Sequence, residues 1–409
     1  MANRLIPSLR LLCYQCLLCF VLWYPSVTYA QSADVLKAIA SEKIGEYDQA
    51  IALAKEQVDK KTWNEAWPRI LASNYLTLGR NAEALATYES SIERFSDSLR
   101  LRLLGHRIYL ANNLKQKADK LVDDLTAQIQ RNPWRYSTKA DLVPLGEFFL
   151  IKGEDPKQVL KLCFDQAVQA DPKNIEAYKA IATMALEKSD AQVAADALQK
   201  ALKIDEEDPQ LNFLASEAWT HSDPNKSADY LQRALELNPK HIPSLLKRAQ
   251  GFLNAENYET SLDVLKRIES INGSLPELWA LRAAIAHLQG DYKREGECRS
   301  QALAEQKLNP IVDALIGKHL SIHYRFAEGA QYQERALKLD PNYQPAKTQL
   351  VQDLLRLGRE SEGWKLLKEA RTGDPFQVTS YNLQLLKGEL DRYSTIEAPG
   401  FLIRMDASE

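Results

Sequence analysis

Most of the chain carries the hydrophobic pattern of α-helices. Leu350, Leu354, Leu355 and Leu357, for example, form one stripe at helical spacing. Prolines separate the helical stretches at intervals of about 34 residues, and most of them follow an acidic residue or an amide. The series runs Asp171-Pro172, Asp208-Pro209, Asn238-Pro239, Leu275-Pro276, Asn309-Pro310, Asp340-Pro341 and Asp374-Pro375. A fixed period of this length is typical of arrays of helix pairs.

Small residues form a second pattern with the same period. Ala182, Ala194 and Ala201 are spaced 12 and then 7 residues apart, as expected where two helices cross closely. The spacing recurs at Ala72, Ala84 and Ser91, at Ala215, Ser227 and Ala234, at Ala249, Ser261 and Ile268, at Gly317, Gly329 and Ala336, and at Val351, Gly363 and Ala370. Between the first two members of a triplet, Gly79, Gly290 and Gly358 predict left-handed helix ends.

These residues resemble the tetratricopeptide repeat (TPR), in which a bulky residue, a Leu-small step and an aromatic residue precede an alanine and a closing proline. The resemblance covers about residues 34–374 and implies an all-α, right-handed solenoid of about ten helix pairs. The pairs are expected near 34–62, 64–97, 98–133, 139–172, 174–207, 210–239, 242–274, 277–308, 311–340 and 343–373. We divide the chain into a signal segment (1–30), a first set of TPR-like pairs (31–133), an irregular pair (134–173), a TPR array (174–375), a capping helix (376–393) and a tail (394–409).

The first thirty residues have the order of a secretory signal peptide. Arg4 and Arg10 precede an apolar run over 11–24, and small residues lead to a predicted cleavage between Ala30 and Gln31. The run is shorter than the roughly 20 residues of a membrane-spanning helix. We therefore expect a protein exported to the periplasm or the outside of a bacterial cell, without stable membrane insertion after cleavage. A retained N-terminal anchor is the alternative.

The C-terminal part carries a second resemblance. Residues 324–330 and 352–359 are similar to the repeat region of large bacterial secreted proteins in which TPRs precede a gluzincin-type zinc peptidase domain. The tail, from Tyr393 through Phe401 to Asp406, resembles the first strand of that domain, but the HExxH zinc-binding helix is not in this sequence. The stretch 401–405 is expected to be a short strand with nothing to pair against.

Composition excludes several kinds of function. The formal net charge of −3 and the pI near 6.2 give no electrostatic basis for nucleic-acid binding. The metal-like spacing of Cys13, Cys16 and Cys19 falls inside the apolar run, where apolar filler is the better interpretation. Cys163 and Cys298 lie about four repeats apart, so we expect two buried free thiols.

No catalytic or cofactor-binding constellation is recognisable, and we expect neither catalysis nor a cofactor. His319 and His323 share a helix face, but Leu320 stands where a zinc peptidase of the HExxH type has its glutamate. Packing or surface placement is therefore the preferred interpretation of both histidines.

In TPR arrays the first helix of each pair faces a concave groove. Taking the register from the small residues, the side chains predicted to line that groove are Lys179, Thr183, Ser216, Trp219, Gln250, Asn254, Lys318, Gln352 and Arg356. Lys179, Lys318 and Arg356 could contribute to binding a carboxylate, although plain solvated surface is the alternative for each residue. The expected function is an exported scaffold that binds a protein or peptide at this groove. The alternative is the non-catalytic N-terminal half of a secreted zinc peptidase. Ligand identity and oligomeric state are not readable from the sequence.

Overall fold

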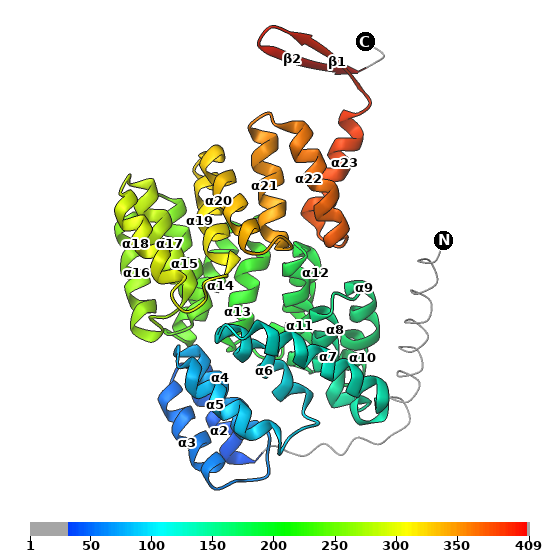
Figure 1. Ribbon diagram of the computed structural model, residues 1–409. Helices are drawn as coiled ribbons and strands as arrows, with labels where there is room; N and C mark the ends of the chain where they lie inside the picture. Colours follow the sequence, from blue (N-terminus) through cyan, green and yellow to red (C-terminus); the bar gives the residue numbers. More distant parts are fainter. Residues whose placement is uncertain (1–31, 407–409) are drawn as a thin grey trace. The chain divides into compact units, whose positions relative to one another are not determined.

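The computed structural model describes residues 32–406 and is built almost wholly of paired α-helices (Figure 1). The first helices of the pairs are α2 (Ala33–Lys43), α4 (Ala66–Thr77), α6 (Leu99–Ala111), α8 (Leu142–Ile151), α11 (Ile175–Glu187), α13 (Pro209–Trp219), α15 (Ile242–Asn254), α17 (Pro276–Leu288), α19 (Pro310–Ile322) and α21 (Gln344–Arg356). The expected helix pairs therefore begin where the register predicts.

The second helices follow the same order. They are α3 (Tyr47–Asp59), α5 (Asn81–Ile92), α7 (Lys115–Arg131), α12 (Ala191–Leu202), α14 (Pro224–Leu237), α16 (Tyr258–Ile271), α18 (Tyr292–Ala302), α20 (Phe326–Leu339) and α22 (Glu360–Gly373). In the fourth pair this helix is divided into α9 (Pro156–Val159), the π-helical turn η3 (Leu160–Phe164) and α10 (Asp165–Ala170), and the 3-10 turns η1 (Pro133–Tyr136) and η2 (Lys139–Asp141) precede the pair. The last helix is α23 (Val378–Leu390).

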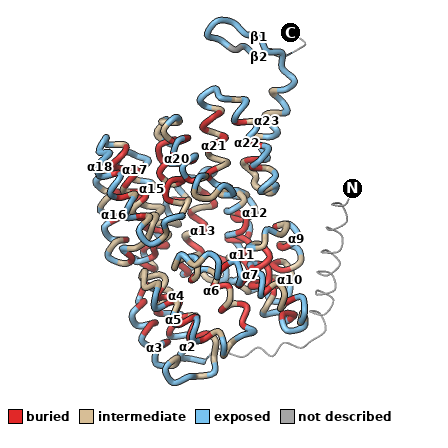
Figure 2. Tube along the Cα trace, viewed as in Figure 1, coloured by how far each residue is buried: buried red, intermediate tan, exposed pale blue. Residues whose placement is uncertain are grey.

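The predicted small residues lie where helices of a pair cross. Ala182, Ala194 and Ala201 are fully buried. In the pair α19–α20, a Cβ atom placed on Gly317 would lie 2.8 Å from the carbonyl oxygen of Gly329. Buried residues accordingly follow the facing sides of the helices (Figure 2). The glycine turns are confirmed as well, because Gly79, Gly290 and Gly358 have φ values of 72°, 78° and 73°.

Two uses of proline explain the 34-residue period. Pro209 and Pro310 occupy the first turn of α13 and α19, where the missing N–H costs no hydrogen bond. The preceding Asp208 and Asn309 cap these helices by accepting hydrogen bonds from Leu211 N (2.9 Å) and Ile311 N (3.0 Å). Elsewhere, as at Asn238-Pro239, the proline follows the end of a second helix.

The chain divides into two compact units. The first contains the residues up to Leu186, Ala191–Arg248 and Lys266–Ser274, and the second contains Glu187–Asp190, Ala249–Leu265 and the residues from Leu275 onward. The predicted segment boundaries at 133 and 173 stay predictions. The signal segment and its cleavage position between Ala30 and Gln31 lie outside the described residues.

Within the first unit, helix-end turns that are far apart in sequence make contact. Lys43 Nζ lies 2.7 Å from Asp205 Oδ2, 162 residues away. Asn238 Nδ2 donates to the Tyr47 hydroxyl (3.2 Å), and Asn272 Nδ2 donates to the Thr77 carbonyl oxygen (3.3 Å). The N-terminal pairs therefore return to turns that lie four or five pairs later along the chain. The array of this unit must curve to make these contacts.

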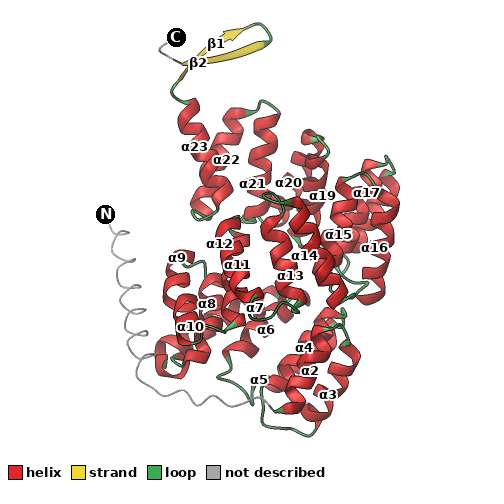
Figure 3. Cartoon of the chain, turned by 180° about the vertical axis from the view of Figure 1, so that it is seen from behind, coloured by secondary structure: helices red, strands yellow, loops and turns green. Residues whose placement is uncertain are grey.

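The C-terminal tail differs from the prediction of an unpaired strand. Strand β2 (Phe401–Asp406) pairs antiparallel with β1 (Tyr393–Ala398), with Ile396 opposite Ile403. Gly400, at φ 82°, lies in the two-residue turn between the strands. The hydrogen-bond groups of β2 thus find partners in the segment immediately before it, and this hairpin is the strand structure seen within residues 32–406 (Figure 3).

Candidate functional site

The nine residues predicted to line a groove fall into both units. Lys179, Thr183, Ser216 and Trp219 belong to the first unit, whereas Gln250, Asn254, Lys318, Gln352 and Arg356 belong to the second. We therefore treat them as two separate sets. Their role in binding stays a prediction.

Two of the predicted groove residues are buried. Ser216 has no exposed surface, and its Oγ donates to the Phe213 carbonyl oxygen (2.7 Å). Trp219 is only 7% exposed, because its ring packs against Tyr230 and beneath Lys226 Nζ, 4.0 Å from the ring centroid. The prediction that these two side chains line an open surface is wrong. Both side chains pack within the α13–α14 pair instead.

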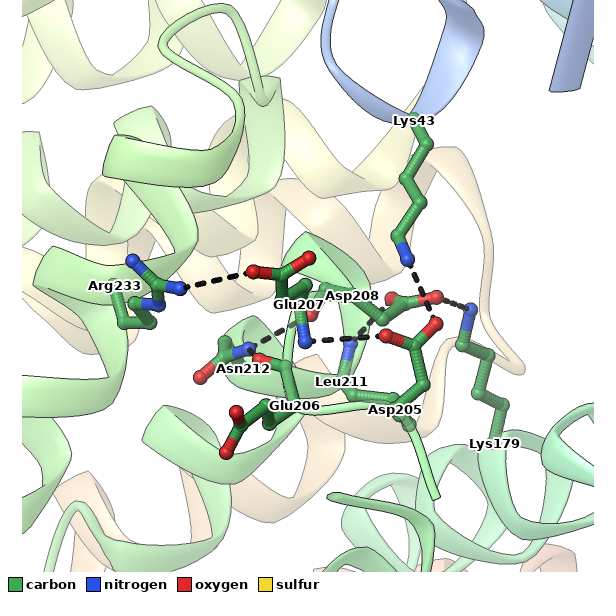
Figure 4. Close-up of polar contacts among 9 residues, drawn as sticks. All are labelled: Lys43, Lys179, Asp205, Glu206, Glu207, Asp208, Leu211, Asn212 and Arg233. Carbon is green, nitrogen blue, oxygen red and sulfur yellow. Dashed lines mark hydrogen bonds and ion pairs between the residues drawn. The ribbon is translucent and has the colours of Figure 1, made fainter. Parts of the chain in front are cut away.

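Lys179 is held in an ion pair at the start of α13 (Figure 4). Its Nζ lies 2.6 Å from Asp208 Oδ2, while the other oxygen of Asp208 caps α13. The neighbouring Asp205 pairs with Lys43 of α2. The two lysines thus neutralise two of the four consecutive acidic residues in this turn. Lys179 therefore links α11 to the start of α13 through this ion pair.

In the second unit the predicted residues remain at or near the surface. Lys318 and Arg356 are exposed, and the Arg356 guanidinium lies 5.1 Å from the centroid of the Phe326 ring. The Asn254 side-chain oxygen Oδ1 accepts a hydrogen bond from His319 Nδ1, 2.9 Å away. His319 itself is fully buried, and this burial lowers its pKa to about 3. The preferred interpretation of His319 as a packing residue agrees with its position.

The first unit also brings together charged residues that the sequence analysis did not select. We call this set the inner surface and define it as Arg69, Arg100, Arg107, Glu147 and Glu176. They come from four first helices, α4, α6, α8 and α11. Arg100 Nη2 lies 2.6 Å from Glu176 Oε2, although the whole fourth pair separates α6 from α11 in sequence.

The span of that ion pair indicates the curvature at this surface. Packed neighbouring helices lie about 8–10 Å apart, so α6 of the third pair and α11 of the fifth are separated by roughly two such spacings where the array is straight. Their side chains can meet only on the side toward which the array bends. The pairing of Arg100 with Glu176 therefore places the set on a concave side of the first unit.

Local capping fixes the two helices that carry this ion pair. The Ser98 hydroxyl accepts a hydrogen bond from Leu101 N (3.0 Å) at the start of α6. At the start of α11, the Asn174 side chain accepts a hydrogen bond from Ala177 N (3.0 Å). Arg100 and Glu176 thus lie on first turns whose positions are set by their own sequence.

The inner surface perturbs the ionisation of its members. Glu147 is exposed to solvent, yet the helices around it remove enough water to raise its pKa to about 7, and Glu176 adds to the effect. Desolvation and the nearby Arg100 lower the pKa of Arg69. Burial raises the pKa of Glu42, at the edge of the set, although Ser73 donates a hydrogen bond to it (3.3 Å). Such clustering of perturbed groups is characteristic of functional sites.

Two members of the inner surface, Arg69 and Glu147, could have been predicted from their positions relative to the small crossing residues. Arg69 precedes Ala72 by three residues, as Lys179 precedes Ala182. Glu147 follows the buried Gly146, whose added Cβ would lie 2.4 Å from the Phe164 ring, so Gly146 is the small crossing residue of the fourth pair. That pair is irregular in sequence, which is why its register was not assigned. The pairing of Arg100 with Glu176 had no local signal, because it depends on curvature.

Other predicted features of the chain can be placed directly. Cys163 and Cys298 are both buried free thiols, as predicted, and burial raises the pKa of Cys163 to about 12. Among residues 32–406, no cluster of three or more His, Cys, Asp or Glu side chains is arranged to hold a metal ion. In the same part of the chain, no helix combines the length and apolarity needed to cross a membrane.

Comparison with known proteins yields limited sequence similarity and clear structural similarity. The family model described as the bacterial transcriptional activator domain matches residues 31–103. No curated protein matches the chain. The crystal structure of the APC/C hetero-tetramer Cut9-Hcn1 is similar with a TM-score of 0.51 at 15% identity, over 92% of this chain and 73% of that chain.

Two further solved structures are similar at lower scores. Yeast Tom70 has a TM-score of 0.42 at 15% identity over 94% of both chains. MamA has a TM-score of 0.33 at 17% identity, over 40% of this chain and 94% of that chain. The likeness to Cut9-Hcn1, together with the paired helices, shows that this chain has a TPR-like helical-repeat fold.

Proposed function

We propose that this chain is a scaffold that binds a segment of another polypeptide at the inner surface of its first unit, without catalysis of its own. The observation that carries the proposal is the convergence of charged side chains from four first helices onto one concave side. Rigid helices that hold polar groups in register are suited to recognising an extended or helical segment.

The chemistry of the surface favours an acidic group in the ligand. Arg107 is exposed and projects from the same side as Glu147, whose pKa near 7 leaves that carboxyl partly neutral at physiological pH. Arginine presents a planar fork of N–H donors that matches a carboxylate. A ligand carboxylate beside Arg107 would gain these hydrogen bonds while facing a glutamate that can give up its charge.

The test is selection of random twelve-residue peptides on the full chain, followed by affinity measurement on variants. Arg107→Glu reverses the charge on the inner surface, and we expect it to weaken the selected peptides about tenfold or more. Lys115→Glu is the matched control, because Lys115 lies on the second helix α7 with a side chain 75% exposed. Equal affinities for both variants would refute binding at the inner surface.

We also propose that the protein is exported and that residues 1–30 are removed. The arrangement of two arginines, an apolar run and small residues up to Ala30 supports this. The test is the N-terminal sequence of the protein isolated from its own cells. A mature chain beginning at Gln31 is expected. A chain beginning at Met1 would mean that the apolar run is kept.

A second candidate function is the non-catalytic half of a secreted zinc peptidase. The observation that favours it is the hairpin β1–β2, which lies where the resemblance places the first strand of the peptidase domain. Its Phe401 is 73% exposed and Ile403 is 50% exposed. The intact mass of the native protein decides: a mass well above 46.3 kDa, with bound zinc, would support this function, and a mass somewhat below it would refute it.

A further inference from the structure

A pocket of about 330 Å³ opens between the loop before α4 and the loop from α5 to α6. All of its lining residues belong to the first unit. This volume is near the lower end of the range of about 300–1,000 Å³ for small-ligand sites. The pocket has the size to take one large side chain and not an extended molecule.

An exposed aromatic pair forms one side of the pocket. Trp63 is 73% exposed, and its ring centroid lies 5.4 Å from that of Phe95, with the rings tilted by 50°. The Arg94 guanidinium lies over both rings, 4.7 Å from the Trp63 centroid and 5.4 Å from that of Phe95. Arg94 also donates a hydrogen bond to the Lys61 carbonyl oxygen, which fixes it there.

The charges around the pocket indicate an uncharged occupant. Arg94 and Arg100 are opposed by Glu65, Asp97 and Asp141, so the lining is close to neutral. The Arg94 guanidinium already occupies the position over the two rings where a cation would bind. A lysine or arginine of a ligand therefore cannot make the same cation–π contact. The lining is otherwise mostly polar, and its one largely exposed apolar side chain is Trp63. A flat ring can stack against the Trp63 ring with the geometry that aromatic pairs prefer.

Arg100 connects the pocket to the inner surface. It lines the pocket and at the same time pairs with Glu176. A polypeptide segment that runs along α6 from Arg107 toward Arg100 would therefore reach the pocket. Arg107 lies seven residues after Arg100 on α6, a rise of about 10 Å along the helix. An extended chain advances about 3.3–3.6 Å per residue, so an acidic residue near Arg107 and a side chain in the pocket would be separated by roughly two to four residues.

We infer that this pocket binds one aromatic side chain of the partner polypeptide, close in sequence to the acidic residue held at the inner surface. This inference rests on the proposed function and specifies its ligand: a segment with an aromatic residue and an acidic residue a few positions apart. Trp63 is the side chain that contacts the bound ring, and Arg94 holds Trp63 and Phe95 in place.

The experiment uses the peptides selected on the full chain. We expect an aromatic residue at a fixed distance from an acidic one, and a loss of affinity of about tenfold or more for Trp63→Ala, as for an aromatic hot spot. Trp134→Ala is the matched control, because Trp134 is 58% exposed but does not line the pocket. Circular dichroism of both variants verifies that they fold.

The outcomes separate the two proposals. Peptides whose affinity falls with Trp63→Ala and Arg107→Glu, but not with Trp134→Ala, support the pocket. Peptides that depend on Arg107 but are indifferent to Trp63, or that lack an aromatic residue, overturn the pocket and leave the proposed function standing. Peptides that depend on neither residue overturn both.

Discussion

Because α19 and α20 cross closely at Gly317, we predict that even a methyl group at this position destabilises the protein. In Gly317→Ala, the new Cβ would lie 2.8 Å from the Gly329 carbonyl oxygen and 2.9 Å from Tyr332 Cβ. Separations below 3.0 Å are essentially never seen for real Cβ atoms, so α20 has to move. The Gln333 amide, 2.7 Å from the new Cβ, cannot swing away without losing its hydrogen bond to the Ala314 carbonyl oxygen (3.0 Å).

Two opposing effects set the size of the change. Replacing glycine by alanine inside a helix favours folding by about 0.5–1 kcal/mol. Overpacking a tight crossing costs about 1–3 kcal/mol. We therefore expect Gly317→Ala to lower the free energy of unfolding by about 1–2 kcal/mol.

Gly296→Ala is the control, because Gly296 is exposed within α18 and a Cβ there meets nothing within 4 Å. It lacks the overpacking cost, and we expect it to raise the free energy of unfolding by about 0.5–1 kcal/mol. Urea unfolding of the full chain, followed by far-ultraviolet circular dichroism, gives both values if the slope is unchanged. A Gly317→Ala protein as stable as Gly296→Ala would refute the close crossing.

Three further predictions concern the first unit. Ala194→Trp should lower the free energy of unfolding by about 1–3 kcal/mol or more, because Ala194 is fully buried at the α11–α12 crossing; an unchanged unfolding midpoint would mean that the register is wrong. A double-mutant cycle of Lys43→Ala and Asp205→Ala should give a coupling of about 0.2–1 kcal/mol, since both side chains are about 30% exposed; zero coupling would refute the prediction that this ion pair contributes to stability. Because the pKa of Glu147 is raised to about 7, the folded protein holds this proton more strongly than the unfolded chain and loses stability as pH rises from about 4.5 through 7. Glu147→Gln should remove that loss, and parallel melting temperatures of the two proteins between pH 5 and 8 would contradict it.

The repeat register predicted the helices well because each pair is specified locally. Small residues at fixed spacing, such as Ala182 and Ala194, mark the crossing, and glycines such as Gly79 mark the turn. These signals depend on residues within one pair, so they can be read along the chain. Cys163 and Cys298 are buried and free, as expected. Their separation of about four repeats was not by itself a sufficient reason, because Lys43 and Asp205 meet although they are 162 residues apart.

The same register was less successful for the site. It placed Ser216 and Trp219 on an open surface, but both pack within the α13–α14 pair. Helix position alone does not say how far the second helix reaches over the first. The C-terminal strand was also expected to be unpaired, because its partner β1 begins next to a helix end and has no alternating pattern that would mark it in isolation.

The sequence by itself determined the fold class, about ten helix pairs near their observed starts and the small residues at which the regular pairs cross, because these depend on spacing over some 34 residues. Only the tertiary structure decided which side chains meet between pairs. Arg100 reaches Glu176 across an intervening pair, and Lys43 reaches Asp205 over 162 residues. Such contacts depend on the rotation that accumulates from pair to pair. Small changes in each crossing add up along the array, and no single local pattern records their sum.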